Sequence, residues 1–461
     1  MALTLRLWCG SVDPSLNVLS AVTEMRNFSA LKTRFKRFFV SKAKKRMAIA
    51  FSLLALFGAI LWVRARPAFR HSFDGVAAVD DPQFARVLES LMGAPLKEDN
   101  DVRALSNGDE IFPAMLEGIR SAKRTISFES YIYWSGQTGT SFAEALSERA
   151  RAGVKVLVLI DWMGGHQADD KSIDAMRAAG VDVAKYNPPT LGTLLDLNNR
   201  THRKLLIIDG HIGFTGGVGI ADKWAGHGES PDHWRDEHYR IEGPTVSQMQ
   251  ATFMDNWVEL RPDIHHDDAY FPEILPAGNK KAQVVHSSPD GGSLKIRLMY
   301  GLFVGGARKT LRISNAYFVP EDAAVDELVL AKKRGVEVEL IVPGEITDSQ
   351  LTRHASRAKW GKLLAAGIAI YQFQPSMYHC KIMIVDDLWV SVGSTNFDNR
   401  SFRINDEANL NIADRDFART QVEKFEADKA VSKRVTLEEW NARGVTGELL
   451  DDAAEMLDTQ L

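Results

Sequence analysis

Cysteine is scarce in this chain, with only Cys9 and Cys380 among 461 residues. Two thiols so far apart provide neither a disulfide framework nor a cysteine zinc site, and they leave the redox compartment open. An excess of charge is also missing, because the formal net charge is −4. The overall charge therefore does not favour nucleic acid as a partner. With 45% hydrophobic and 25% charged residues, the composition is that of a globular protein of two or three domains.

Long hydrophobic runs are also scarce, and the uncharged run at 47–63 has only 17 residues. As a helix it would span about 26 Å, slightly less than the bilayer core of about 30 Å. The segment 1–46 that precedes it carries eight Lys or Arg between positions 32 and 46. The positive-inside rule places this basic side in the cytoplasm, so we expect a single transmembrane helix with the rest of the chain extracytoplasmic. A cleaved signal peptide, a buried core helix and a helix lying on the membrane surface are the alternatives.

Beyond a linker at 64–98, the chain repeats itself in the same order. Four pairs of segments match: AKRTISFESYIYW (122–134) with ARKTLRISNAYFVP (307–320), RARAGVKVLVLID (149–161) with AKKRGVEVELIVP (331–343), AAGVDVAKYNPP (178–189) with AAGIAIYQFQPS (365–376), and HRKLLIIDG (202–210) with HCKIMIVDD (379–387). Each copy alternates short apolar runs with amphipathic helical segments, which predicts an α/β fold with a largely buried sheet.

The repeat predicts two similar α/β lobes, at 99–257 and 285–461, joined by a polar linker at 258–284. A pseudo-twofold axis between such lobes would bring equivalent loops together. A site at that axis would then receive one copy of each repeated motif.

The fourth pair of segments contains the same polar pattern twice, a His, a Lys two residues later and an Asp five residues after the Lys. The two copies are His202, Lys204 and Asp209, and His379, Lys381 and Asp386. Residues i and i+2 of a strand face the same side, so each His projects into the same space as its Lys. Cys380 should point to the opposite side, into the core. One copy alone would carry little weight, but two copies at equivalent places of a repeat indicate a shared site.

Two histidines and two lysines suit phosphoryl transfer. Lysines are point charges for phosphate oxygens, one neutral imidazole can attack phosphorus, and the other can act as general acid and base. Neither motif contains a carboxylate cluster that would hold Mg²⁺. We therefore expect chemistry that requires no metal and no cofactor.

Further candidate residues lie downstream of each motif. Ser394 and Asn396, in GSTNFDNRSF, could donate hydrogen bonds to phosphate oxygens. In the first half the counterpart is GFTGGVGIADKW, where Gly217 could contact phosphate or simply form a tight turn. Glu407 and Asp236 follow the two segments, and a carboxylate there could fix the tautomer of an imidazole through its Nδ1–H.

These motifs resemble those of the phospholipase D superfamily, and more closely those of its bacterial cardiolipin synthase branch. The resemblance covers about residues 99–415 and rests on FESYIYW, HRKLLIIDG, GFTGG, WRDEHYRIEGP, AYFVP, HCKIMIVDD, VGSTNFDNRSF and NDEANL. It implies two lobes with mixed β-sheets flanked by helices, and metal-independent transfer of a phosphatidyl group. Cardiolipin synthases join two phosphatidylglycerols and release glycerol, which implies phosphatidylglycerol as the substrate and the bacterial inner membrane as the location.

The resemblance also implies roles for individual residues. His202 would be the nucleophile and His379 the general acid and base, although symmetry allows the reverse. The lysines, Ser394 and Asn396 would bind phosphate, and Asp236 and Glu407 would orient the histidines. Asp209 and Asp386 close the motifs and are expected to support the strands. One departure is Gly219, which stands where the family often carries an Asn in the first copy.

Three other functions are compatible with these motifs. In a phospholipase D hydrolase, water replaces the lipid alcohol and phosphatidic acid is released. A phosphodiesterase nuclease of the same superfamily is disfavoured by the acidic balance and the expected membrane helix. A non-catalytic scaffold is disfavoured because both motifs are complete. The sequence does not predict the oligomeric state.

Overall fold

The computed structural model describes residues 44–45, 47–55, 58, 72–189, 198–288 and 294–456. The chain divides into two compact units, Met1–Arg70 and His71–Leu461, and the whole repeat lies in the second. The predicted transmembrane segment is described only at 47–55 and 58, which are helical, and its other residues lie outside the described part, as does 1–43 of the basic segment. No helix within the described ranges has the length and apolar character needed to cross a membrane.

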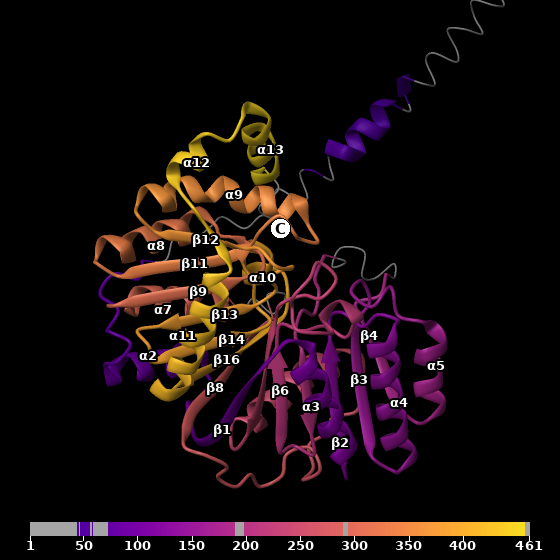
Figure 1. Cartoon of the computed structure of the whole chain (residues 1–461). Helices are drawn as coiled ribbons and strands as arrows, with labels where there is room; N and C mark the ends of the chain where they lie inside the picture. The colour runs from indigo at the N-terminus through magenta and orange to yellow at the C-terminus, as the bar shows by residue number, and fades with distance from the viewer. Residues whose placement is uncertain are drawn as a thin grey trace, which may run out of the picture. The chain divides into compact units, whose positions relative to one another are not determined.

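The second unit is built on one mixed sheet of 15 strands (Figure 1). From the middle outward, the first half contributes β1 (Lys97–Ser106), β7 (Glu237–Glu242), β6 (Ile212–Gly216), β5 (Leu205–Ile208), β2 (Thr125–Ser130), β3 (Lys155–Asp161) and β4 (Asp182–Tyr186). The second half contributes β8 (Lys280–Ser287), β16 (Glu407–Ala413), β14 (Trp389–Gly393), β13 (Lys381–Val385), β9 (Thr310–Asn315), β11 (Glu337–Pro343), β12 (Ala369–Phe373) and β17 (Ser432–Val435). Apart from β17, the two halves have the same strand order, which confirms the α/β fold with a mixed sheet.

The two halves share this one sheet, whereas the sequence predicted two similar lobes with mixed β-sheets and did not indicate that they are continuous. They are joined because β1 pairs antiparallel with β8, with Lys97 opposite Ala282. Pairing covers an edge strand that each half would otherwise leave open. The sequence did not indicate this junction because both strands begin inside segments predicted to be linkers. The predicted domain boundaries stay predictions.

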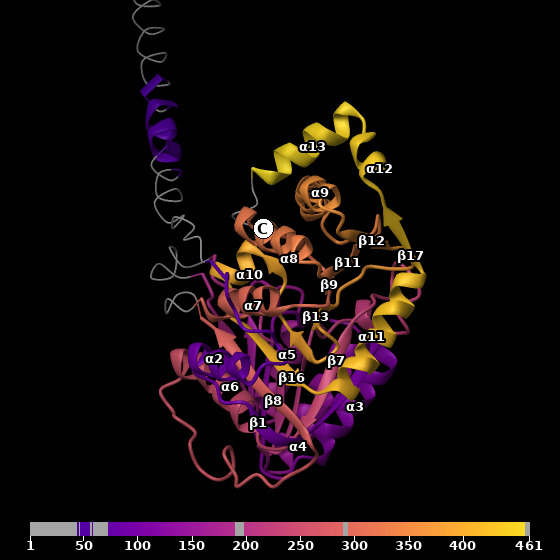
Figure 2. The ribbon, with the colours of Figure 1, turned by 90° about the vertical axis from the view of Figure 1, so that its left-hand side faces the viewer.

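Helices cover both faces of the sheet in each half (Figures 1 and 2). In the first half, α3 (Asn107–Ser121), α4 (Gln137–Arg151) and α5 (Asp170–Ala178) share one hydrophobic cluster with the sheet, and α6 (Val246–Leu260) lies in another cluster. In the second half, α7 (Lys295–Gly306), α8 (Asp322–Lys333) and α9 (Gln350–Ala365) pack on one face, together with α2 (Pro82–Met92), and α11 (Arg415–Ala430) on the other. The cluster that contains α6 and α11 is common to both halves.

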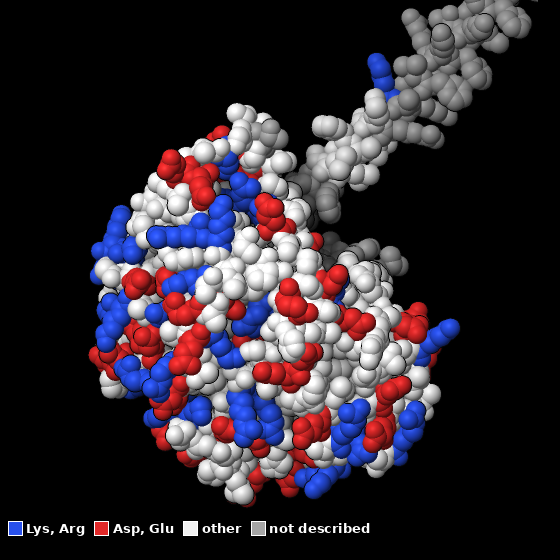
Figure 3. Space-filling model, in the orientation of Figure 1, with Lys and Arg blue, Asp and Glu red and all other residues white. Residues whose placement is uncertain are grey.

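The remaining described elements are short or lie after the repeat. They are the 3₁₀ turn Asp222–Trp224, β10 (Phe318–Val319), β15 (Phe397–Asp398), α10 (Asn399–Arg403), α12 (Leu437–Asn441) and α13 (Val445–Glu455). On the face seen in Figure 3, acidic and basic side chains are interspersed.

The two motif strands have apolar side chains on both faces, as expected of strands buried between helical layers. In β13, Ile382 and Ile384 belong to the cluster shared by the halves, whereas Met383 and Val385 face α7 and α8. Cys380 is fully buried among the first group, which confirms that it points away from Lys381.

Candidate active site

Each motif places its histidine and lysine at the entrance of a central strand. The ammonium group of Lys204 donates to the carbonyl oxygen of His202 at 2.8 Å. In the same way, Lys381 donates to the carbonyl of His379 at 2.6 Å, and its Nζ lies 3.1 and 3.2 Å from the two ring nitrogens. All four side chains are buried. The period of two along the strand therefore does keep each His next to its Lys.

The backbone ties each motif to the opposite half of the molecule. The amide of His202 donates to the carbonyl of Asp406 at 2.9 Å, and the amide of Asp406 donates to Arg200. The equivalent contact joins the amide of His379 to the carbonyl of Arg235 at 2.8 Å. Both contacts are short parallel β-bridges. Each histidine is thus fixed beside the residue that precedes a carboxylate of the other half.

The carboxylates consequently reach across the pseudo-twofold axis. Glu407, from the second half, lies 3.0 and 3.1 Å from Nδ1 of His202. Asp236, from the first half, lies 2.7 Å from Nδ1 of His379. A carboxylate at Nδ1 favours the tautomer with the proton there, which leaves Nε2 with a free lone pair. Each motif histidine is thus paired with a carboxylate of the other half.

Burial makes the positive forms of the first motif unfavourable. It lowers the pKa of His202 to about 4, although the charge of Glu407 opposes the change. It also lowers the pKa of Lys204 to about 7, against the attraction of Glu407 and with added repulsion from Lys381. Removing a charged group from water disfavours its ionised form, which is the main cause in both cases. The charge of Lys381 acts on Lys204, so the two lysines lie within electrostatic range of each other.

The second motif has the same electrostatic character. Burial lowers the pKa of His379, helped by the charge of Lys381, and also lowers the pKa of Lys381 itself. Burial alone would raise the pKa of Asp236 and Glu407, but the neighbouring histidines and lysines outweigh it and lower both. The site therefore combines neutral imidazoles with ionised carboxylates. Within the described ranges, no group of three His, Cys, Asp or Glu converges as a metal site would require.

The aspartates that close the motifs lie at the far ends of the strands from the histidines. Asp209 accepts hydrogen bonds from the backbone amides of residues 123–125, and Asp386 from those of 308–310, all at 2.7–2.9 Å. Both residues adopt left-handed backbone conformations, with φ of 52° and 53°. Asp209 joins the start of β2 to the end of β5, and Asp386 joins the start of β9 to the end of β13. Neither aspartate lines the site.

Of the predicted phosphate donors, Ser394 and Gly217 form hydrogen bonds with the protein itself. The hydroxyl of Ser394 donates to Glu407 at 2.5 Å. The carbonyl oxygen of the Asn396 side chain is buried and has no hydrogen-bond partner in the described part of the chain. The amide of Gly217 donates to the carbonyl of Glu237 at 3.1 Å, and a Cβ at Gly217 would lie 2.2 Å from the carboxylate of Asp236. Their roles toward phosphate stay predictions.

Trp224 donates to Asp236 in the first half, as Ser394 donates to Glu407 in the second, and the sequence analysis did not identify it. Its indole N–H donates to Asp236 at 3.0 Å, and its ring lies 5.2 Å from the His379 ring, centroid to centroid. A Cβ on Gly219 would lie 2.8 Å from Cβ of Ile132 and 3.1 Å from the Trp224 indole. The indole thus occupies the space of the side chain that Gly219 lacks. The signal was present in the sequence, since GFTGGVGIADKW carries a Trp where the second copy has none.

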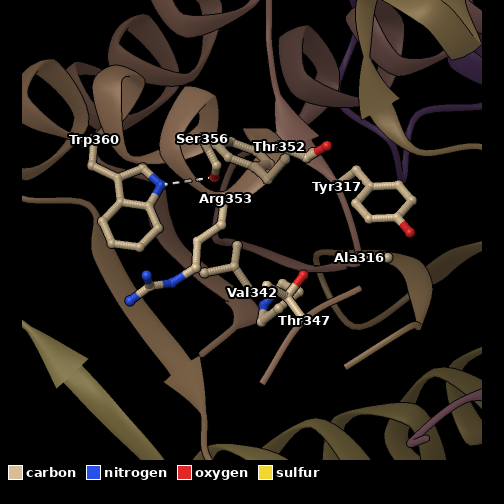
Figure 4. Close-up of a pocket in the computed structure, with 10 residues that line it drawn as sticks. Ala316, Tyr317, Val342, Thr347, Thr352, Arg353, Ser356 and Trp360 are labelled. Atoms are coloured by element: carbon tan, nitrogen blue, oxygen red, sulfur yellow. Dashed lines mark hydrogen bonds between the residues drawn. The ribbon is translucent and has the colours of Figure 1, made fainter. Parts of the chain in front are cut away.

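Aromatic side chains form the walls around the histidines. Tyr131 lies edge-on to His202 with ring centroids 5.2 Å apart, and Lys204 lies 5.8 Å from the Tyr131 centroid. Tyr317 lies edge-on to His379 at 6.1 Å. Tyr317 also closes one side of a small cavity, with Trp360 on the opposite side (Figure 4).

Comparisons with known proteins agree with this geometry. The chain matches the family described as "Cardiolipin synthase, PLD-like domain" over residues 115–253 and 303–429. It is 31% identical to a cardiolipin synthase of Staphylococcus aureus over 381 residues, which cover 81% of this chain and 77% of that protein. It is 33% identical to the major cardiolipin synthase of Bacillus subtilis over 390 residues, covering 84% and 80%.

A solved structure confirms the fold. The crystal structure of phosphatidylserine synthase from Haemophilus influenzae Rd KW20 superposes with a TM-score of 0.63 at 14% identity, over 82% of this chain and all of that one. At that identity the likeness concerns the fold alone. The family match and the two relatives cover most of the chain, including both histidine motifs. This chain belongs to the cardiolipin synthase branch of the phospholipase D superfamily.

Proposed function

We propose that this protein is a phosphatidyltransferase of the cardiolipin synthase type, which transfers a phosphatidyl group from one phosphatidylglycerol to another and releases glycerol. The observation that supports it most is the single buried site formed by two His–Lys pairs, each completed by a carboxylate of the other half. The cardiolipin synthases among its relatives support the choice of lipid substrates.

The first step forms a covalent phosphatidyl–histidine. His202 carries its proton on Nδ1 toward Glu407, so the lone pair of Nε2 attacks phosphorus. The P–N bond forms as the P–O bond to the leaving glycerol breaks, and His379 gives that oxygen a proton. Lys204 and Lys381 offset the negative charge of the phosphate oxygens.

In the second step, the hydroxyl of an acceptor lipid takes the place of the glycerol that left, and the phosphatidyl group is transferred from His202 to it. A hydroxyl of the acceptor lipid gives its proton to His379 and its oxygen attacks phosphorus, while the P–N bond breaks and restores His202. The low pKa of His202, about 4, keeps this nucleophile neutral before substrate binds. A bound phosphodiester anion favours the protonated forms of His379 and the lysines, which the acid role and phosphate binding require.

A lipid product assay tests this proposal. Purified protein mixed with phosphatidylglycerol vesicles is expected to produce a lipid with two phosphates together with an equal amount of free glycerol. His202→Ala and His379→Ala are each expected to abolish both products. If phosphatidic acid is the only lipid product, the protein is instead a phospholipase D hydrolase.

We further propose that residues 47–63 anchor the protein in the bacterial inner membrane as a single helix. The support is the basic segment 32–46, which by the positive-inside rule keeps the N-terminus cytoplasmic. The lobes would then lie on the extracytoplasmic side. A reporter fused after residue 461 is expected to be active only outside the cytoplasm, and activity inside it would contradict this orientation.

A further inference from the structure

A third carboxylate lies close to the site, beside the two that contact the histidines. Asp348 belongs to the loop between β11 and α9 and is exposed to solvent. Its Oδ2 accepts a hydrogen bond of 2.5 Å from the hydroxyl of Tyr317, the residue whose ring lies edge-on to His379. Within the described residues, Oδ1 of Asp348 makes no hydrogen bond. Tyr317 therefore holds a carboxylate with one open oxygen near His379.

The charge of Asp348 reaches both halves of the site. Burial lowers the pKa of His379 and of Lys381, and Asp348 is among the carboxylates whose charge opposes this. Burial raises the pKa of Tyr131, with contributions from Asp161 and from Asp348. Tyr131 stands beside His202, so Asp348 is within electrostatic range of the walls next to both histidines.

A carboxylate in this position does not suit the donor phosphate. A phosphodiester is an anion, and Asp348 would repel it, whereas the lysines attract it. A carboxylate accepts hydrogen bonds strongly from neutral hydroxyls, and such charge-assisted bonds are stronger than neutral ones. The ligand that fits Asp348 is therefore an uncharged group with hydroxyls.

We propose that Asp348, held by Tyr317, binds a polyhydroxyl acceptor and so favours a glycerol headgroup over water or a simple alcohol. The inference rests on the proposed phosphatidyltransferase function. One hydroxyl of the glycerol group gives its proton to His379 and attacks the phosphatidyl–His202 phosphorus, as the P–N bond breaks. A second hydroxyl of the same group donates to Asp348, which orients the first. Asp348 takes no proton in the reaction.

A competition between two alcohols tests this role. The donor is phosphatidylglycerol, and the acceptors are labelled glycerol, which exchanges into the lipid, and 1-propanol, which forms phosphatidylpropanol. Loss of one charge-assisted hydrogen bond predicts that Asp348→Asn lowers the preference for glycerol about tenfold to a hundredfold. Transfer to 1-propanol, which has no second hydroxyl to bind Asp348, should fall less than transfer to glycerol. Tyr317→Phe should lower the preference in the same direction, since it frees the carboxylate to move.

The matched control is Glu345→Gln, because Glu345 lies in the same loop, has a side chain that is 90% exposed, and lies 3.7 Å from Arg353. This variant should keep the wild-type preference. An unchanged preference in Asp348→Asn, or equal loss of transfer to both alcohols, would overturn the acceptor role. A wild-type protein that makes only phosphatidic acid would overturn both this inference and the proposed function. Cardiolipin formation with an unchanged preference in Asp348→Asn would overturn the inference alone.

Discussion

Because each carboxylate contacts the histidine of the other half, we expect Glu407→Gln in the second half to disable His202 in the first. Glu407 accepts from Nδ1 of His202 and from the hydroxyl of Ser394. A glutamine has one carbonyl oxygen in place of two carboxylate oxygens and carries no charge, so its hydrogen bond to His202 is no longer charge-assisted. Loss of one charge-assisted bond costs about 1.5–3 kcal/mol, and a change of tautomer adds to it. Since 1.36 kcal/mol is tenfold in rate, turnover should fall about 10²- to 10⁴-fold, a range that includes the loss seen for Asp→Asn in the serine protease triad.

Burst kinetics with a p-nitrophenyl ester of phosphatidic acid separate the two carboxylates. Nitrophenolate leaves without a proton, so formation of the covalent intermediate needs the nucleophile but not the acid. Asp236→Asn is therefore expected to give one burst of nitrophenol per site followed by slow turnover, because His379 can no longer act as base. Glu407→Gln is expected to give no burst.

Ser394→Ala is a milder variant that serves as a control for Glu407→Gln and Asp236→Asn. It removes a hydrogen bond to Glu407 and keeps the charge, so the burst should persist with a rate reduced only about tenfold. A burst in Glu407→Gln and none in Asp236→Asn would exchange the roles of the two histidines. Normal bursts and normal turnover in both variants would refute the reasoning.

Three further predictions follow from individual contacts. The pKa of His202 near 4 predicts that kcat/KM rises with pH through about 4, as His202 loses its proton, and falls again as His379 and Lys204, whose pKa values burial lowers, lose theirs; a rise centred near pH 6.5 would contradict this. Asp386→Ala leaves three backbone amides without their acceptor and should lower the free energy of unfolding by about 2–4 kcal/mol in urea, whereas Asn, which tolerates the left-handed backbone, should cost less; full stability with lost activity would argue for a chemical role. Gly219→Asn, which restores the residue common in the family, should destabilise the protein by about 1–3 kcal/mol in urea unfolding because its Cβ meets Ile132 and Trp224; a gain in activity would contradict the fit.

The sequence predicted the fold and the central residues because both leave local patterns. A repeated order of apolar runs predicts repeated strands and helices, and the period of two places His379 beside Lys381 and Cys380 opposite them. The pairing of β1 with β8 was missed because both strands begin in predicted linkers and lie outside the four matching pairs of segments.

Contacts that cross between the halves could not be predicted from spacing. Asp236 lies 34 positions after His202 and Glu407 lies 28 after His379, yet each carboxylate contacts the histidine of the other copy. The short β-bridges between the halves bring each carboxylate to the histidine of the other copy, and the spacing along the chain does not indicate them. Trp224 was missed for a similar reason, because it contacts Asp236 from a position where the second copy has no Trp.

The most direct test of the central claim is to map the covalent intermediate. The reaction with phosphatidylglycerol is quenched with denaturant at mildly alkaline pH, where phosphohistidine and the acyl esters survive, and the peptides are analysed by mass spectrometry. The predicted result is a phosphatidyl adduct on His202 of the wild-type protein. The His202→Ala variant should carry no adduct, and His379 should carry none in either protein. An adduct on His379, or turnover with no adduct on either histidine, would contradict the account.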